Sequence, residues 1–350
     1  MRVLSDAERR FIERMPKAEL HVHLEGSVYP DTLLALGEKH GQPFPFADLD
    51  GARDWFQFRD FPHFVEIYIT ICNVLLDEED NARITYELAR RAAAQNIRYL
   101  EVTFAPASIL NPRHVGVPDV VWPGVRAGAR RAREELGVEM QFILDPVRGR
   151  PEEEVMEMVR WAVNNMGDGL VGVGLGGMEL GNPATRHADA YGYAKAAGAR
   201  LSLHAGETDG PRSIREALDL GSERIGHGVT AIHDPQLVEE LAATGMVLEV
   251  SPTSNICLGV FPSIAEHPFR ALYDAGVQVT INSDDPPMFN TTLTNEYLTL
   301  AEQHDFSLDE LSALSLRAVD AAFLPDADRR RLRAEFEAEL AALRAELCAE

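Results

Sequence analysis

The chain has 350 residues, of which 45% are hydrophobic and 25% charged, a balance that supports a large core and excludes wholesale disorder. Its 33 basic and 56 acidic residues give a net charge of −23. A negative surface repels polyphosphate, so DNA and RNA polymers are disfavoured as partners. The three cysteines, Cys72, Cys257 and Cys348, are too few and too scattered for a disulfide framework or a thiolate zinc site.

The N-terminal segment has no continuous apolar region and no small-residue cleavage site, so we do not expect a secretory signal. The longest apolar stretch, GLVGVGLGGM, is about half of the roughly 20 residues that span a bilayer. We therefore expect a cytoplasmic protein with no membrane contact. The sequence gives no indication of its oligomeric state.

Short β-rich runs alternate with helical segments along the chain. From Arg98 onward the starts of successive runs are about 20 to 40 residues apart, which is one βα unit. The pattern predicts eight strands: Glu19–Leu24, Arg98–Ala105, Glu139–Asp145, Leu170–Gly176, Arg200–His204, Arg224–Gly228, Met246–Ser251 and Val277–Asp284.

Eight alternations favour an α/β fold in which a parallel sheet closes into a single (β/α)8 TIM barrel, one domain over residues 1–350. About 80 residues separate the first two strands, against roughly 30 for an ordinary βα unit. The extra segment, at about 30–95, is rich in aromatic residues and follows the active-site end of the first strand, so we expect helices forming a lid or pocket wall. An outer decoration is the alternative. Residues 326–348 predict an amphipathic C-terminal helix.

His21 and His23 lie at i and i+2 of the first predicted strand, so both imidazoles face the same way, into the barrel. Buried side by side, they would leave polar groups unpaired unless something coordinates them. Alone, this pattern is a weak signal for a metal and more often marks a satisfied core or surface pair of histidines.

Two further motifs stand at strand ends. His204 closes the fifth strand, and the small Ala-Gly pair after it allows a turn that brings Glu207 back over the barrel mouth, where a carboxylate suits acid–base work on a metal-activated water. A helix-capping acid is the alternative. Asp284 and Asp285 end the eighth strand; adjacent acids repel each other unless a cation offsets the charge. An ordinary Asp-Asp-Pro turn is the alternative there.

His227 ends the sixth strand between two glycines, which allow the backbone or a ligand to approach. Four signals thus fall at strand ends on one barrel face. Three histidines and one aspartate form a donor set for zinc or another divalent metal, with a position left for water. Their coincidence predicts a mononuclear metal hydrolase site.

In order, the segments PKAELHVHLEGS, SLHAGET, RIGHGV, SPTSN and INSDDPP resemble the adenosine deaminase family of the metal-dependent amidohydrolase superfamily. The resemblance runs from about Pro16 to Phe323. It implies hydrolytic loss of the 6-amino group of an aminopurine as ammonia. It also implies one Zn²⁺ per chain, held by four ligands: His21, His23, His204 and Asp284.

The resemblance also implies roles around the substrate. Glu207 would protonate N1 of the purine, and His227 would orient the attacking hydroxide. Asp285 would hold N7, the backbone at Gly177 would contact N3, and Glu25, with His23 beside it, would reach the sugar side. Glu207, His227 and Asp285 are therefore the expected catalytic residues.

The substrate side departs from the family pattern. Glu25 is similar to adenine deaminases, whereas Gly226 points to nucleosides because adenine deaminases tend to have aspartate there. Gly174 stands where aspartate is typical, and Met178 where a polar residue is. The mixture is similar to members acting on 6-aminodeoxyfutalosine, a 5′-modified adenine nucleoside of menaquinone synthesis. Its benzoate would need a cation, for which Arg148 and Arg150 are candidates.

The sequence therefore predicts a purine nucleoside as the small-molecule partner, adenosine or a 5′-modified adenosine. A free-base adenine deaminase is the enzyme alternative. A catalytically inactive ligand-binding barrel is the non-enzyme alternative. A 5′-phosphate is disfavoured because Glu25 and the acidic surface would repel it.

Overall fold

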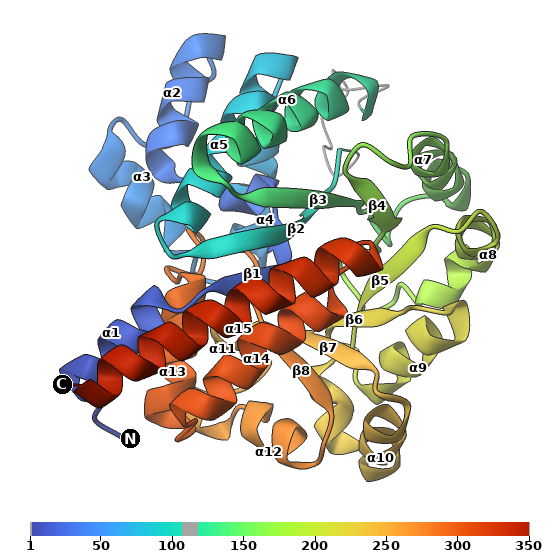
Figure 1. Ribbon diagram of the computed structural model, residues 1–350. Helices are drawn as coiled ribbons and strands as arrows, with labels where there is room; N and C mark the ends of the chain where they lie inside the picture. The colour runs from blue at the N-terminus through green and yellow to red at the C-terminus, as the bar shows by residue number, and fades with distance from the viewer. Residues whose placement is uncertain (1, 107–117, 350) are drawn as a thin grey trace.

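The computed structural model describes residues 2–106 and 118–349 (Figure 1). Its eight strands form one sheet in sequential order, every neighbouring pair parallel. All eight predicted strands are present, and the predicted TIM barrel is confirmed. The strands are β1 (Lys17–His23), β2 (Ile97–Phe104), β3 (Glu139–Leu144), β4 (Leu170–Val173), β5 (Arg200–Ala205), β6 (Arg224–His227), β7 (Val247–Val250) and β8 (Gln278–Ile281).

The barrel closes between its first and last strands just beyond the end of β8. Val22 forms an isolated parallel bridge with Asp284. The backbone N–H of His23 donates to the Asp284 carbonyl at 3.0 Å, and the Asp284 N–H donates to the His21 carbonyl at 3.2 Å. The closure therefore brings three of the predicted metal ligands together through the main chain alone.

Several strands end earlier than predicted. β4 stops at Val173, three residues before the predicted end, and the two glycines that follow lie against the Asp145 carboxyl group. β8 stops at Ile281, three residues before its predicted end, and Asp284 then takes the left-handed conformation, with φ of 65°. In both cases the regular strand therefore ends just before the predicted site residues.

The helices surround the strands (Figure 1). α1 (Asp6–Arg14) begins at a capping box between Ser5 and Glu8, which satisfies two free N–H groups of its first turn. The remaining α-helices are α2 (Pro30–His40), α3 (Leu49–Phe56), α4 (Phe61–Cys72), α5 (Glu78–Ala93), α6 (Pro118–Leu136), α7 (Glu152–Asn164), α8 (Ala188–Ala196), α9 (Pro211–Leu220), α10 (Pro235–Thr244), α11 (Pro252–Cys257), α12 (Phe269–Asp274), α13 (Leu293–Gln303), α14 (Leu308–Ala321) and α15 (Asp326–Ala349). Short 3-10 turns are η1 (Glu25–Ser27), η2 (Ala184–His187), η3 (Val229–His233) and η4 (Ile264–Glu266).

The long segment between β1 and β2 forms α2 to α5. α4 reaches the mouth of the barrel, because Phe64 stacks on Phe289, which follows β8, with 5.5 Å between ring centroids and 7° between ring planes. α5 packs beside α6, whose Gly124 has no room for a β carbon against the Glu78 carbonyl. The predicted insertion therefore contains both a wall helix at the mouth and an outer barrel helix.

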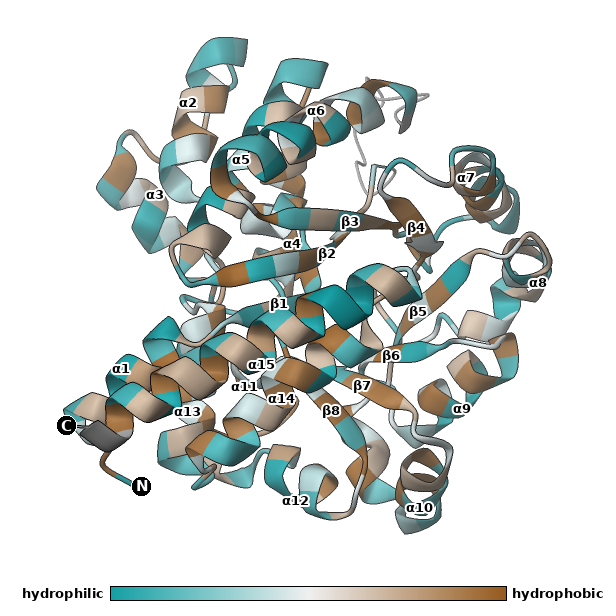
Figure 2. Ribbon diagram, viewed as in Figure 1, coloured by the Kyte–Doolittle hydropathy of each residue, from teal (hydrophilic) through white to brown (hydrophobic). Residues whose placement is uncertain are grey.

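α15 lies at the opposite end of the barrel. Its Glu339 pairs with Arg98 at the start of β2, at 3.2 Å, and Glu346 pairs with Arg14 of α1 at 2.6 Å. Figure 1 shows α15, in red, crossing in front of the strands and ending beside α1. Figure 2 shows apolar residues along the strands and polar residues on the outward helix surfaces. Within the described ranges no helix is long and apolar enough to cross a membrane.

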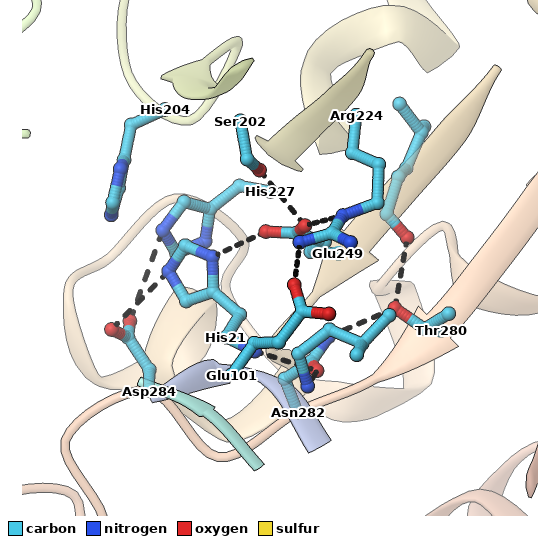
Figure 3. A network of polar contacts seen from close by, with 12 residues as sticks. His21, Glu101, Ser202, His204, Arg224, His227, Glu249, Thr280, Asn282 and Asp284 are labelled. Carbon is cyan, nitrogen blue, oxygen red and sulfur yellow. Dashed lines mark hydrogen bonds and ion pairs between the residues drawn. The ribbon is translucent and has the colours of Figure 1, made fainter. Parts of the chain in front are cut away.

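A buried ion network fills part of the barrel interior. Arg224 on β6 contacts Glu249 on β7 through Nε at 2.5 Å and Glu101 on β2 through Nη2. All three side chains are at most 2% exposed. Glu249 also accepts from Ser202 and faces Nδ1 of His21 at 3.0 Å (Figure 3). The network therefore connects the barrel core to the predicted metal ligands.

Replacing Arg224 with Met is expected to lower the free energy of unfolding by about 3–5 kcal/mol, because it removes the buried cation that both Glu101 and Glu249 contact. Urea unfolding followed by circular dichroism measures this. The control is Arg200→Met, whose pair with Glu223 is 41% exposed on both sides and should contribute no more than about 1 kcal/mol. Equal stability of the two variants would contradict the role of the network.

Candidate active site

Four predicted ligands meet at the carboxyl ends of β1, β5 and β8. Nε2 of His23 lies 3.1 Å from Nε2 of His204 and 3.3 Å from Oδ1 of Asp284, and Nε2 of His21 lies 3.7 Å from the same oxygen. All four side chains are buried. Figure 3 shows His21, His204 and Asp284 converging with His227 on one small region. The structure therefore brings together every ligand that the sequence predicted.

The backbone is specialised where these side chains emerge. His227 and Asp284 both adopt positive φ, at 63° and 65°. This region is uncommon for residues other than glycine, and such strain clusters at functional sites. Next to His227, a β carbon on Gly226 would stand 2.9 Å from Cε1 of His21. Glycine at 226 thus allows the His21 ring to lie against β6.

The cluster fits a metal ion. Nε2 of His21 is buried with no hydrogen-bond partner among the described residues. Its Nδ1 faces Glu249, an arrangement that orients a ligating imidazole and leaves Nε2 toward the metal. Burial opposes a charge on His21, but the nearby carboxylates of Asp284 and Glu249 raise its pKa to about 10. The pocket therefore favours positive charge, which a divalent cation can supply.

Asp284 is oriented as a ligand would be. Ser254 Oγ donates to Oδ2 at 2.7 Å, while Oδ1 faces His21 and His23. Burial acts against its ionisation, but the proximity of these two histidines holds the pKa of Asp284 well below its usual range. Three histidine nitrogens and one carboxylate oxygen match the ligand types of a catalytic zinc site.

Glu207 stands beside this cluster, on a turn that begins with Gly206 at φ of 68°. Its Oε1 is buried and has no hydrogen-bond partner in the part of the chain that the structure describes. It lies 3.8 Å from Nδ1 of His227. Burial, followed by the charges of Asp284 and Glu179, raises the pKa of Glu207 to about 8. Burial and these charges therefore favour the protonated form of Glu207, which is the form that can donate a proton.

His227 is neutral in this setting. Burial lowers its pKa to about 3, with the charges of His21 and His23 acting the same way against the attraction of Asp284. Its Nε2 lies 3.8 Å from Asp284 Oδ2. A neutral imidazole at this position can hold a water or hydroxide beside the proposed metal ligands without carrying a charge of its own.

The remaining predicted contacts also lie at the mouth. Asp285 Oδ1 is buried without a hydrogen-bond partner in residues 2–106 and 118–349, and a β carbon on Gly26 would strike it. Glu25 is 3% exposed and accepts from the Ala105 N–H at 3.1 Å and from the Tyr68 hydroxyl at 3.3 Å. Because Tyr68 belongs to α4, the insertion contributes directly to the pocket around Glu25.

Gly177 follows β4 in the left-handed conformation, with φ of 88°. A β carbon there would stand 3.0 Å from Val147 Cγ1, on the loop after β3. Glycine is therefore needed at 177 for conformation as well as for space. The tight packing fixes the peptide that the sequence predicted to contact the ring.

Two carboxylates at the site were missed by the sequence analysis. Glu179 accepts from three successive N–H groups of the Glu207 turn: Glu207 at 3.3 Å, Thr208 at 3.1 Å and Asp209 at 2.8 Å. It anchors the loop after β4 to the turn after β5. Asp145 is 2% exposed and has a donor atom within 4.8 Å of donors on His23 and His204. Its place at the end of an apolar strand was the signal that could have identified it.

The contacts of Arg148 and Arg150 give no support to the suggestion that they bind a substrate carboxylate. Arg148 is 1% exposed, and its guanidinium donates to the main-chain carbonyls of His204 and of Asn182. Arg150 pairs with Glu154 one helical turn along α7, at 2.5 Å. Arg148, in the loop after β3, instead ties the loop after β4 to the end of β5 by donating to a main-chain carbonyl of each.

Sequence comparison shows which known proteins resemble this chain. The family model for adenosine deaminase matches residues 16–339. An aminodeoxyfutalosine deaminase of Streptomyces avermitilis is 39% identical over 95% of this chain and 93% of the relative. An adenine deaminase of Rhizobium leguminosarum is 39% identical over 91% of this chain and 98% of the relative.

Solved structures of related proteins have a similar fold. An adenine deaminase from Arthrobacter aurescens has a TM-score of 0.87 and 31% identity, covering 94% of this chain and 98% of its own. An amidohydrolase from Burkholderia ambifaria with bound zinc has a TM-score of 0.91 and 29% identity, covering 100% and 97%. With the buried histidine and aspartate cluster, these matches show a hydrolase that deaminates an adenine-containing substrate. The chain belongs to the adenosine deaminase family.

Proposed function

We propose that the chain removes the 6-amino group of an adenine nucleoside by hydrolysis, releasing ammonia. The substrate is adenosine or a 5′-modified adenosine, with 6-aminodeoxyfutalosine the leading candidate. The main support for this chemistry is the position of Glu207 beside a cluster of three histidines and an aspartate. Its Oε1 is buried and has no hydrogen-bond partner among the described residues. The 39% identity to the Streptomyces avermitilis enzyme supports the choice of substrate.

His21, His23, His204 and Asp284 would hold one zinc ion per chain. Their donor atoms lie within reach of one another, and a zinc-containing relative shares the fold. When bound, zinc lowers the pKa of water to around 7 and so makes a nucleophile available at neutral pH. Two residues outside this set orient its members: Glu249 contacts His21, and Ser254 donates to Asp284.

The protein side chains carry the rest of the reaction. A water oxygen adds to C6 of the purine while protonated Glu207 gives its proton to N1, so the ring does not accumulate negative charge. His227 keeps the attacking oxygen in place. Asp285 and the Gly177 N–H hold N7 and N3. The first proton of the water restores Glu207, and the proton of the new C6 hydroxyl group passes to the 6-amino group, which leaves as ammonia and produces a 6-oxopurine.

Glycine at 226 favours a nucleoside over the free base. Adenine deaminases tend to carry aspartate at this position, and here a β carbon would already stand 2.9 Å from the His21 ring. Glu25, held by Ala105 and Tyr68, is then available to a sugar hydroxyl. Free adenine remains the second candidate, because Glu25 itself is the adenine-deaminase type of residue and relatives of that name are equally similar in sequence.

A comparison of kcat/KM for adenine, adenosine, 2′-deoxyadenosine, 6-aminodeoxyfutalosine and AMP tests this proposal. A hydrogen bond to a charged group is worth about 1.5–3 kcal/mol. We therefore expect adenine to be about 10- to 100-fold poorer than the best nucleoside. AMP should also be poor, because its phosphate would approach Glu25.

Glu25→Gln provides the control within the same panel. It should lower kcat/KM for nucleosides and leave the value for adenine almost unchanged, because the glutamine oxygen can still accept from the Ala105 N–H and the Tyr68 hydroxyl can turn to accept from the amide nitrogen. If adenine proves the best substrate of the wild-type protein, the free-base alternative is correct and the nucleoside proposal is wrong.

A further inference from the structure

A line of three hydrogen bonds leads away from His227, on the side opposite the proposed metal ligands. The Phe269 N–H donates to Nδ1 of His267 at 3.2 Å, Nε2 of His267 lies 3.1 Å from Oδ1 of Asn255, and Nδ2 of Asn255 lies 3.2 Å from Nδ1 of His227. His227, Asn255 and His267 are at most 3% exposed. Neither Asn255 nor His267 has a role in the reaction described above.

The direction of this line is fixed at its outer end. Phe269 is the first residue of α12, and the first N–H groups of a helix have no partner within the helix. A backbone N–H can only donate, so Nδ1 of His267 must be the unprotonated nitrogen of its ring. Burial lowers the pKa of His267 to about 3, which keeps the ring neutral. Its single proton therefore lies on Nε2.

The orientation of the Asn255 amide follows from this. Because Nε2 of His267 donates, the atom of Asn255 that faces it must be the carbonyl oxygen, and the NH2 group must face His227. The flipped amide would set two N–H groups against each other at 3.1 Å. Nδ1 of His227 therefore accepts, and the proton of His227 lies on Nε2.

We infer that Asn255 and His267 are positioning residues that hold His227 in the tautomer with its proton on Nε2, facing the reacting atoms. This inference deepens the proposed function, since it rests on His227 acting beside the attacking oxygen. In this tautomer Nε2 donates toward Asp284 and the attacking oxygen, 3.8 Å separating Nε2 from Asp284 Oδ2. Nδ1 is turned toward Asn255 and is not free to act as a donor to Glu207.

Asn255→Asp tests the inference, because it keeps the shape of the side chain and removes the donor. An aspartate carboxylate can only accept, so Nδ1 of His227 must then carry a proton. We expect kcat to fall by about 10²-fold or more, with KM, zinc content and melting temperature close to those of wild type. His267→Gln is the matched control: its amide still donates to Asn255, so most of kcat should remain.

Nitrogen NMR of the zinc-loaded protein labelled with ¹⁵N-histidine gives a readout that does not depend on activity. The wild-type protein and His267→Gln should show His227 protonated on Nε2 and unprotonated on Nδ1, and Asn255→Asp should show Nδ1 protonated. A wild-type His227 with its proton on Nδ1 would overturn the inference, as would an Asn255→Asp variant with unchanged kcat. If Asn255→Asp does not fold, the wild-type spectrum decides. A wild-type protein with the expected spectrum and no deaminase activity would refute the proposed function alone.

Discussion

Glu207→Gln is expected to lower kcat by about 10²- to 10⁴-fold, the usual contribution of a positioned general acid. Glutamine keeps the shape of the side chain but has no proton that it can transfer to N1 of the purine. Since Oε1 of Glu207 has no partner among the described side chains, the substitution breaks no hydrogen bond of that atom. Steady-state rates of ammonia release, with zinc content and melting temperature measured in parallel, separate loss of chemistry from loss of structure.

Asp209→Asn is the control on the same turn. Its side chain pairs with Arg212 at the surface, while its backbone N–H is held by Glu179 as in the wild-type protein. We expect its kcat to stay within about two- to threefold of the wild-type value, since exposed ion pairs contribute little. A Glu207→Gln enzyme that turns over at the rate of Asp209→Asn would remove Glu207 from the mechanism.

Asp284→Asn should abolish tight zinc binding and lower kcat by about 10³-fold or more. The substitution replaces the one anionic ligand with a neutral amide, and Lewis-acid stabilisation by a metal is worth several kcal/mol in a transition state. Zinc binding measured by competition with a chromophoric chelator gives the affinity directly. Zinc should also raise the melting temperature of the wild-type protein much more than that of the variant, because a ligand that binds only the folded state stabilises it.

Ser254→Ala supplies an intermediate case. Ser254 donates to Asp284 without lying among the proposed ligands, and loss of such an outer partner typically weakens metal affinity about 10- to 100-fold. We therefore expect zinc affinity to fall in the order wild type, Ser254→Ala, Asp284→Asn. An Asp284→Asn protein that holds zinc as tightly as Ser254→Ala would exclude Asp284 as a ligand.

The barrel could be predicted from the sequence because its signals are local. Each strand is an apolar run of a few residues, and each predicted ligand stands within or directly after such a run. Parallel strands in sequential order then bring all carboxyl ends to one face. His21, His204 and Asp284 could be placed together in this way without any knowledge of distances.

What the sequence did not reveal depends on contacts between distant segments. Arg148 has the same appearance in the sequence whether it lies in a solvated loop or donates to the carbonyl of His204, 56 residues away. The line from His267 through Asn255 to His227 joins a loop residue, a helix residue and a strand residue. Glu179 meets the Glu207 turn about 30 residues further along the chain. No periodicity or propensity encodes such pairings.

Glycines carried information that the sequence analysis used only in part. Gly174 and Gly176 were noted as departures from the family pattern or as parts of a strand. In the structure, a β carbon at either position would stand 2.4 Å or 2.2 Å from an oxygen of Asp145. The glycines therefore make a slot for a carboxylate from the neighbouring strand, a relation that appears only when β3 and β4 lie side by side.

Ammonia release by the wild-type protein, stripped of metal and then reloaded with zinc, tests the proposed chemistry most directly. With an adenine nucleoside as substrate, we expect no turnover after chelation, full recovery at one zinc per chain, and one ammonia for each 6-oxopurine formed. Turnover that persists without metal, or zinc-loaded protein that leaves every adenine nucleoside unchanged, would contradict zinc-dependent nucleoside deamination at this site.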